Sequence, residues 1–273
     1  MSKAGVFEAK KKDGTVYYRS SVTYKGKHIS LGSYADETSA SDAYKVAVRV
    51  LGIRADMGNE SGAEPEIDDY EECGTAVSFD KWVMLVNLRR SGIYCRNPIL
   101  LENKFFRYYV DRHTVLLFDV DDLFYYMNHK IMKRGGRLFV ADFGMQVGIL
   151  SRYGIHSFAV KDRDYVFKNG DENDLRYSNI AVINRYFGVT RSGGEGRYAY
   201  TARIHINGDN IVGRYHSEEK AAIAYNKAVD VLEANGFKRP FYRNYIEGLS
   251  PIQYKTLYNT VKIRKRKYEI VPE

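Results

Sequence analysis

An internal repeat constrains the architecture of this chain more than any other feature of its sequence. The segment 18–44, YRSSVTYKGKHISLGSYADETSASDAY, is similar to the segment 200–225, YTARIHINGDNIVGRYHSEEKAAIAY. Gly26 aligns with Gly208 at an offset of 182 residues, whereas the ends of the two segments align at an offset of 181. The second copy has therefore lost one residue, which the alignment places within residues 211–213. We expect two copies of one small module, one toward each end of the chain.

Each copy predicts a β-hairpin followed by a helix. Tyr18, Ser20, Val22 and Tyr24 alternate with Arg19, Ser21, Thr23 and Lys25, which is the period of a half-buried strand. Lys25-Gly26 and Asn207-Gly208 favour tight turns, from which a second strand returns. Small residues then recur at helical spacing, and they let the helix pack closely on one sheet face: Ala40, Ala43, Tyr44 and Ala47 in the first copy, and Ala221, Ala222, Ala224, Tyr225 and Ala228 in the second. The other sheet face is expected to be open and polar.

The balance of charges favours a polyanionic partner. The chain has 42 Lys and Arg residues against 34 Asp and Glu residues, which gives a formal net charge of +8 and a pI near 9.2. Two cysteines, Cys73 and Cys95, are too few for a four-thiolate zinc site or a disulfide scaffold, so we expect a reduced, cytoplasmic setting. No run reaches about 18 apolar residues, so we expect neither an export signal nor a membrane partner.

The repeated module resembles the ethylene-response-factor (Apetala-type) DNA-binding domain of plants, which also occurs in bacterial and phage proteins. The matching elements are Gly5-Val6, Tyr18-x-Ser20-x-Val22, Gly26-Lys27, Leu31-Gly32-Ser33-Tyr34 and the first helix, and then Gly188-Val189, Tyr200-x-Ala202-x-Ile204, Gly208, Gly213-Arg214-Tyr215 and the second helix. In that family a three-stranded sheet lies in the major groove and its outward side chains contact bases and phosphates. The resemblance implies that this chain binds double-stranded DNA.

The resemblance assigns DNA contacts to side chains that alternate with the core positions. The implied readers are Arg19, Ser21, Thr23, His28 and Ser30 in the first copy and Thr201, Arg203, His205 and Asn210 in the second. Phosphate-binding charge is expected from Lys10, Lys11, Lys12 and Lys25 in the first copy and from Arg191 and Arg197 in the second. Arg and Asn can each form two hydrogen bonds with the edge of one base, whereas Lys, Ser and Thr mostly contact phosphate. The second copy is therefore expected to carry more of the sequence specificity.

The end of the segment between the copies, residues 164–180, resembles the ββα-metal motif of His-Asn-His (HNH) endonucleases. The resemblance rests on Asn169-Gly170-Asp171, Asp174-Leu175-Arg176 and Ser178-Asn179-Ile180, after which a short helix is expected to run into the second module. Many bacterial and phage endonucleases of this family carry an ethylene-response-type domain in the same C-terminal position.

The histidines on which that nuclease chemistry depends are absent. Val166 and Phe167 stand where the resemblance implies a metal ligand and the general base, respectively, and Ser151 stands where it implies a further histidine. Asn179, which in the family orients the catalytic histidine, and Asn184, at the place of a last metal ligand, are retained. We therefore expect no catalytic residues, no bound metal and no cofactor. The degenerate core would then serve DNA docking, homodimerisation or contact with a protein partner.

The predicted fold is α+β, with two modules of a three-stranded antiparallel sheet plus a helix flanking a central mixed α/β domain. The expected parts are a first DNA-binding module at 1–57, an acidic, mobile and solvated linker at 58–76, the HNH-like central domain at 77–186, the second DNA-binding module at 187–240 and a basic tail at 241–273. We expect the tail either to follow a phosphate backbone or to form a solvated helix.

Three functions are compatible with these features. The preferred one is a sequence-specific DNA-binding regulator of a bacterium, phage or mobile element without nuclease activity. The second is a metal-dependent HNH-type endonuclease with an atypical site that uses His156, His113 or the Asp and Asn residues around Asn169. The third is a phage-type inhibitor or adaptor whose central domain binds a host protein.

Overall fold

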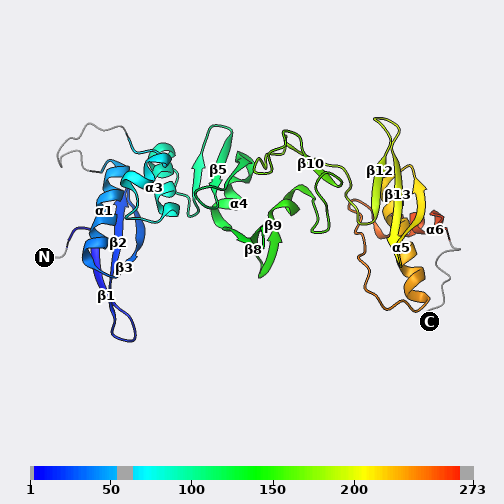
Figure 1. The fold of residues 1–273 in the computed structure, drawn as a ribbon, viewed down its shortest axis with the longest axis horizontal. Helices are drawn as coiled ribbons and strands as arrows, with labels where there is room; N and C mark the ends of the chain where they lie inside the picture. Colours follow the sequence, from blue (N-terminus) through cyan, green and yellow to red (C-terminus); the bar gives the residue numbers. More distant parts are fainter. Residues whose placement is uncertain (1–2, 54–63, 265–273) are drawn as a thin grey trace. The chain divides into compact units, whose positions relative to one another are not determined.

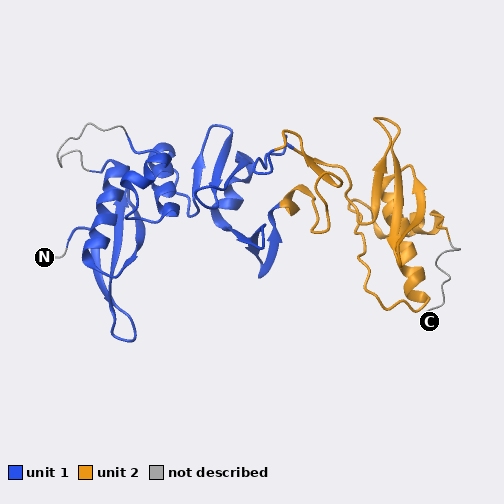
Figure 2. Cartoon of the chain, in the orientation of Figure 1, with its two compact units in different colours: residues 1–149, 171–179 blue, residues 150–170, 180–273 orange. Residues whose placement is uncertain are grey.

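The computed structural model describes residues 3–53 and 64–264, whose helices and strands Figure 1 shows in chain order. Two compact units are distinguished in Figure 2: residues 1–149 with 171–179 form unit 1, and residues 150–170 with 180–273 form unit 2. Both units combine helices with small antiparallel sheets, which confirms the expected α+β class. The segment 77–186, expected as one central domain, is divided between the two units.

The first module is a sheet covered by a helix on one face. β1 (Val6–Lys10), β2 (Val16–Tyr24) and β3 (Lys27–Tyr34) pair in that order, and α1 (Glu37–Leu51) contacts all three strands. Alternate strand residues meet the small residues of the helix, because only alanine lets the helix backbone approach the sheet closely. The resulting core includes Val22, Ile29, Leu31, Ala43 and Ala47.

The second module repeats this arrangement. β12 (Val189–Ser192), β13 (Ala199–His205) and β14 (Asp209–Tyr215) form the sheet, and α5 (Glu218–Ala234) covers one face of it. Its core includes Val189, Ala202, Ile204, Val212, Ala224 and Ala228. The expectation that both ends of the chain share one fold of three strands and a helix is therefore confirmed.

The two copies also share their irregularities. In each copy the last strand has one extra residue opposite the middle strand, Leu31 or Val212, and the middle-strand residue after this bulge donates its backbone N–H to a glycine before the first strand. Ser21 donates to Gly5 over 3.0 Å, and Arg203 donates to Gly188 over 2.7 Å. A bulge bends a strand and re-aims its side chains, so the same bend at the same place gives both sheets the same curvature.

A helix tyrosine packs against that glycine in each copy. Gly5 and Gly188 have φ of +71° and +70°, and an added Cβ would overlap the ring of Tyr44 and of Tyr225 respectively. Only glycine combines this backbone conformation with so close an approach of an aromatic ring. The Gly-Val and Ala-Tyr elements seen in the sequence thus meet in space.

Strand pairing places the lost residue in the hairpin turn. Thr23 pairs with His28 across four intervening residues, whereas His205 pairs with Asp209 across three. The two copies therefore correspond at an offset of 181 from the start of β14 onward. The placement of the loss within residues 211–213 is wrong, because backbone pairing rather than residue similarity fixes which positions are equivalent.

Much of the acidic segment expected as a solvated linker is folded. η1 (Ile67–Asp69) and α2 (Tyr70–Cys73) lead into α3 (Phe79–Ser91), and α3 packs on α1. Tyr70 is buried, with its ring edge-on to that of Trp82. The expectation of a mobile connector is therefore wrong from η1 onward, because these two aromatic side chains bury apolar surface that outweighs the local charge. Residues 58–63 of the expected linker lie outside the described residues.

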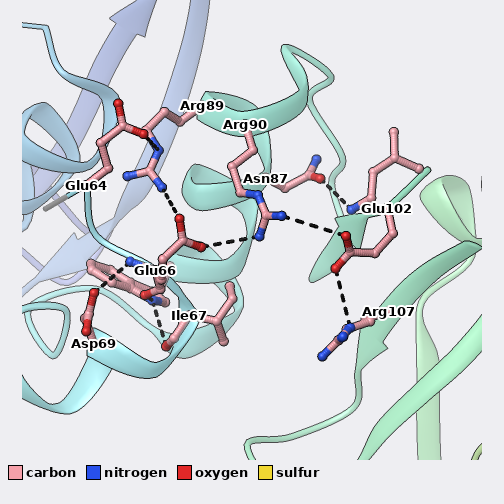
Figure 3. Close-up of polar contacts among 11 residues, drawn as sticks. Glu64, Glu66, Ile67, Asp69, Asn87, Arg89, Arg90, Glu102 and Arg107 are labelled. Atoms are coloured by element: carbon pink, nitrogen blue, oxygen red, sulfur yellow. Dashed lines mark hydrogen bonds and ion pairs between the residues drawn. The ribbon is translucent and has the colours of Figure 1, made fainter.

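A chain of alternating charges fastens this segment to α3 (Figure 3). The carboxylate of Glu66 contacts both Arg89, at 3.0 Å, and Arg90, at 3.3 Å. Arg90 also contacts Glu102 at 3.7 Å, and Glu102 in turn contacts Arg107 at 3.5 Å. The Arg89 side chain is only 10% exposed, and Glu66 together with Glu64, at 3.6 Å, supplies the counter-charge that its burial requires.

The remainder of unit 1 contains two further three-stranded antiparallel sheets. β4 (Ile99–Leu101), β5 (Phe105–Tyr109) and β6 (Val115–Asp119) form the first, and η2 (Val120–Asp122) and α4 (Leu123–Asn128) follow it. The second consists of β7 (Ile131–Arg134), β8 (Arg137–Asp142) and β9 (Met145–Gly148). The rings of Phe106, Phe118 and Tyr126 pack together and are fully buried.

Unit 2 adds short elements around the second module. η3 (Ile149–Tyr153) precedes a two-stranded antiparallel sheet of β10 (Tyr165–Phe167) and β11 (Ile180–Val182). After α5, the chain ends its described part with α6 (Pro251–Thr260), which packs on α5 through Tyr254, Leu257 and Tyr258. The tail was expected either to follow a phosphate backbone or to form a solvated helix. It does contain a helix, largely exposed, but one side of that helix packs on α5, and Ile246 and Val261 on either side of it are buried in the core of unit 2. Residues 265–273 lie outside the described residues.

Candidate nucleic-acid interface

The face of the first sheet opposite α1 carries most of the predicted DNA contacts. Cross-strand neighbours share a face, so the register defines its rows of side chains. Phe7, Arg19 and Ser33 form one row across the three strands, and all three are exposed. Thr23 and His28 form a second exposed row near the turn.

An aromatic pair flanks Arg19 on this face. The guanidinium of Arg19 donates a hydrogen bond to the Tyr17 hydroxyl at 2.7 Å and lies 5.5 Å from the centre of that ring. Phe7, across the strand pair, is 57% exposed. Sequence reasoning missed both aromatic residues, although Tyr17 stands two residues before Arg19 and must share its face. Together they form a surface that can hydrogen-bond a base edge or phosphate and pack against a sugar.

The predicted lysines of the first module lie at the two ends of the sheet. Lys11 and Lys12 are exposed in the turn between β1 and β2, and Lys25 is exposed in the turn between β2 and β3. Because the turns lie at opposite ends of β2, their charges extend the cationic surface in both directions along the strand. Flexible ammonium groups in such positions suit phosphate contacts better than base reading.

The open face of the second sheet is built around two arginines. Arg203 is exposed on β13, and Arg214 on β14 is exposed in the row of Thr201. Arg203 and Thr201 alternate on one strand, so the two arginines occupy diagonal positions on the same face. Sequence reasoning missed Arg214, although the match of Gly213-Arg214-Tyr215 to Gly32-Ser33-Tyr34 already aligned it with Ser33, which lies on the open face of the first copy. Arg197, in the turn before β13, is also exposed.

His205 is engaged on this face by a neighbouring acid. Its Nδ1 lies 3.0 Å from the carboxylate of Asp209, which is its cross-strand partner. In the first copy the equivalent pair is Thr23 and His28, which has no acid. The negative charge of Asp209 weakens the attraction of this end of the second sheet for phosphate.

Three of the predicted contacts lie on the helix side of their sheets, which corrects the assignment. Lys10 shares the face of the buried Val6, and Arg191 shares that of the buried Val189, because each stands an even number of residues along the same strand. Asn210 pairs with the buried Ile204, and its amide donates to the backbone oxygens of the turn at 2.9 and 3.0 Å. The shortened turn moved Asn210 from the open face to the other.

Two further predicted readers are on the open face but are poorly accessible. Ser21, at the bulge, is 9% exposed, and Thr201, in the middle strand, is 6% exposed. Short side chains at the centre of a sheet are covered by their longer neighbours, so neither can reach a base edge without rearrangement. Ser30, which pairs with Ser21, remains exposed.

The HNH-like segment has a structural explanation for its retained asparagines. The Asn179 side chain is 5% exposed and its amide donates to the backbone oxygens of Asp171 and Asp174 at 3.2 and 2.8 Å. Asn184 donates to the Asp164 carboxylate at 3.0 Å and accepts the Arg191 N–H at 2.7 Å. Both amides thus hold backbone or neighbouring side chains in place.

The β10–β11 pair departs from the expected motif. Val166 and Phe167 are half-buried in β10, and β11 is followed by turns rather than by the expected short helix. That expectation is wrong, because Asn184 and the chain after it are tied into the start of the second module.

The two candidate histidines have different surroundings. His156 stacks on Phe158, with ring centres 5.1 Å apart, and His113 is exposed in the turn before β6. Across the described residues, no group of three His, Cys, Asp or Glu side chains is placed to hold a metal ion.

Asp164 illustrates the electrostatics of this segment. Burial works to raise the pKa of Asp164, but hydrogen bonds from Arg163, the Val160 N–H and Asn184 outweigh it and hold the pKa below its ordinary value. Arg163 donates to this carboxylate at 2.6 Å. The carboxylate therefore links β10 to the loop before it and to the chain after β11.

Comparison with known proteins gives no relative: no family model, no curated protein and no solved structure matches this chain. Within the described residues, none of the helices has the length and apolar character needed to cross a bilayer.

Proposed function

We propose that this chain binds double-stranded DNA through the open faces of its two sheet-and-helix modules and acts as a sequence-specific regulator. The observation that carries the proposal is the repeated placement of exposed cationic side chains on the sheet face that no helix covers. Arg19 and His28 occupy it in the first copy, and Arg203 and Arg214 in the second. The net charge of +8 acts in the same direction.

The dimensions of a module suit the major groove. The outer strands of a three-stranded sheet lie about 10 Å apart, and the major groove is about 12 Å wide. A sheet whose open face lies in the groove would present its middle strand to the bases and its outer strands to the phosphates. Arg203 and Arg19, both on middle strands, are then the base-reading candidates, while the turn lysines hold the backbone.

The two modules are expected to contribute unequally. The second face carries two guanidinium groups, which can each form paired hydrogen bonds with guanine. The first face carries one, together with the lysines of its turns. We therefore assign most of the specificity to the second module and much of the general affinity to the first.

The test is selection of bound duplexes from random DNA by the full chain, followed by titration of the selected site and of random duplex. Arg203→Ala and Arg214→Ala should each weaken binding to the selected site by about 1 to 3 kcal/mol and narrow its advantage over random DNA. Lys11→Ala should weaken both duplexes alike and reduce the salt slope by about one. Lys220→Ala, a change at an exposed cation on α5, is the matched control and should alter neither.

Two results would overturn the proposal. One is the absence of binding to any duplex at low salt. The other is equal loss on selected and random DNA for Arg203→Ala, which would mean that the open face does not read bases. Adding magnesium or manganese to the same samples scores cleavage, and metal-dependent cleavage would favour the endonuclease alternative.

A further inference from the structure

The sheet of β7, β8 and β9 has one buried face and one exposed face. Ile131 and Val140 pair across β7 and β8 and are 3% and 1% exposed, so their face is buried. On the other face, Met132, Phe139 and Gly148 form one row across the three strands. Phe139, on the middle strand, therefore lies at the centre of the other face, and its side chain and that of Met132 are half-buried.

Two arginines lie opposite each other in the next row of this face. Arg134 pairs with Arg137 at the end of the β7–β8 hairpin, and Arg137 stands two residues before Phe139, so all three share the face. Both arginines are exposed, and within the described parts of the chain neither has a carboxylate within the 4.0 Å ion-pair distance. Like charges placed directly opposite destabilise a strand pair unless an anion lies between them.

The face borders a concavity of about 720 Å³, whose lining includes Lys130, Met132, Lys133, Arg134, Phe139 and Gln146. Asp111 is the acidic residue of this lining, and its carboxylate accepts the backbone N–H groups of His113 and Thr114 at 2.8 and 2.7 Å. The cavity therefore has an apolar floor and three cations, of which Lys130 is paired with Asp80 at 3.0 Å, and its one carboxylate accepts hydrogen bonds within its own loop.

The space beside the Phe139 ring is open. A Cβ added to Gly148, its neighbour on β9, would meet no atom within 4 Å. The Gly148 position therefore leaves open space beside Phe139. Phe143, in the β8–β9 turn, is 97% exposed.

We propose that this face, formed by Met132, Arg134, Arg137, Phe139 and Gly148, binds single-stranded nucleic acid. A phosphate lies between the two arginines and an unpaired base stacks on Phe139. Adjacent rows of one sheet face are about 7 Å apart, which lets one nucleotide reach both. Aromatic stacking beside a cationic groove is the usual means of holding single strands.

The alternatives fit the face less well. The bases of a duplex are stacked inside it and cannot lie flat on a ring at the floor of a concavity. An acidic peptide would satisfy the arginines, but it gives no reason for an open planar slot beside an aromatic ring. The proposal concerns unit 1 residues outside the two modules, and it does not depend on duplex binding by them.

The experiment measures binding of a labelled thymidine oligonucleotide of about 20 nucleotides to the full chain by fluorescence anisotropy at low salt. Phe139→Ala and Gly148→Leu should each weaken binding about tenfold, the first by removing the stacking ring and the second by filling the slot. Arg134→Gln should weaken oligonucleotide binding and lower the salt dependence of that binding. Gly194→Leu, at another glycine with open space, and Arg96→Gln, at another exposed arginine of unit 1, are the controls and should bind like the parent chain.

Circular dichroism melting of each variant establishes that the fold persists, and Gly148→Leu keeps the proposal testable if Phe139→Ala unfolds the sheet. The proposal is overturned if the oligonucleotide does not bind, or if binding depends on Arg134 but not on Gly148. It is also overturned if labelled polyglutamate binds as tightly with the same dependence on Gly148, which would identify an acidic protein as the partner. Binding of duplex DNA is measured in parallel for the parent chain and for Arg203→Ala. If duplex DNA does not bind while the oligonucleotide still does, only the proposed function is refuted.

Discussion

The hydroxyl of Ser20 should destabilise unit 1, so that its removal stabilises the protein. Ser20 is fully buried between Val6 and Gly32 in the first sheet, and its Oγ has no hydrogen-bond partner among the described residues. At the equivalent position of the second sheet, between Val189 and Gly213, the chain has Ala202, which is also fully buried. One fold thus accommodates both residues at one position.

The expected magnitude follows from this comparison. A buried hydroxyl without a partner costs about 1 to 3 kcal/mol of desolvation, and alanine at this position leaves almost no cavity because it lacks a single oxygen atom. Ser20→Ala should therefore stabilise unit 1 by about 1 kcal/mol and raise its melting temperature by about 2 to 4 °C. The reciprocal change, Ala202→Ser, should lower the stability of unit 2 by a similar amount.

The assay must separate the two units. Native-state hydrogen exchange of the amides of α1 and α5 reports the opening free energy of each module within the same sample. Ser20→Ala should slow exchange in α1 and leave α5 unchanged, and Ala202→Ser should speed exchange in α5 alone. Faster exchange of α1 in Ser20→Ala would refute the reasoning, because it would mean that the hydroxyl makes a stabilising hydrogen bond.

Three further predictions concern packing and charge. Gly188→Ala should destabilise unit 2 by at least about 2 kcal/mol in urea unfolding, because its φ is +70° and the added Cβ would lie 2.5 Å from a backbone oxygen, whereas Gly194→Ala should be near neutral. Asp164 has a folded pKa below its ordinary value of 3.8, so its contribution is complete above that value and is lost as the pH falls through the folded pKa. Asp164→Asn should therefore destabilise unit 2 at pH 7 and make its stability depend less on pH below that value. Urea titrations between pH 2 and pH 7, about the range of carboxylate ionisation, measure this, and an unchanged pH dependence would contradict it. Glu66→Gln removes the closer of the two carboxylates beside the buried Arg89, while Glu64 remains at 3.6 Å, and should cost about 1 to 2 kcal/mol, against less than about 1 kcal/mol for the exposed Glu71→Gln, both measured by chemical unfolding of unit 1.

The repeat was predictable from the sequence because its determinants are local. Alternation along Val16–Tyr24, a tight turn at Lys25-Gly26 and alanines at helical spacing each act over a few residues. Together they predict two modules of three strands and a helix, and that architecture is confirmed in both copies. The same alternation correctly placed Arg19, Thr23 and Arg203 on the exposed face.

The rest was decided by interactions between residues far apart in the chain. The bulge, together with the loss of one residue from the second turn, determines which face each strand residue occupies, so Asn210 could not be placed from residue similarity. Tyr70 and Trp82 fold an acidic stretch whose charge alone predicts a solvated linker, because the free energy of burying aromatic surface depends on what lies opposite. The face of Arg134, Arg137 and Phe139 likewise exists only once β7 and β8 pair in register. The sequence by itself determined the local elements, whereas tertiary pairing decided which side chains meet, because long-range register is not encoded in any short stretch of chain.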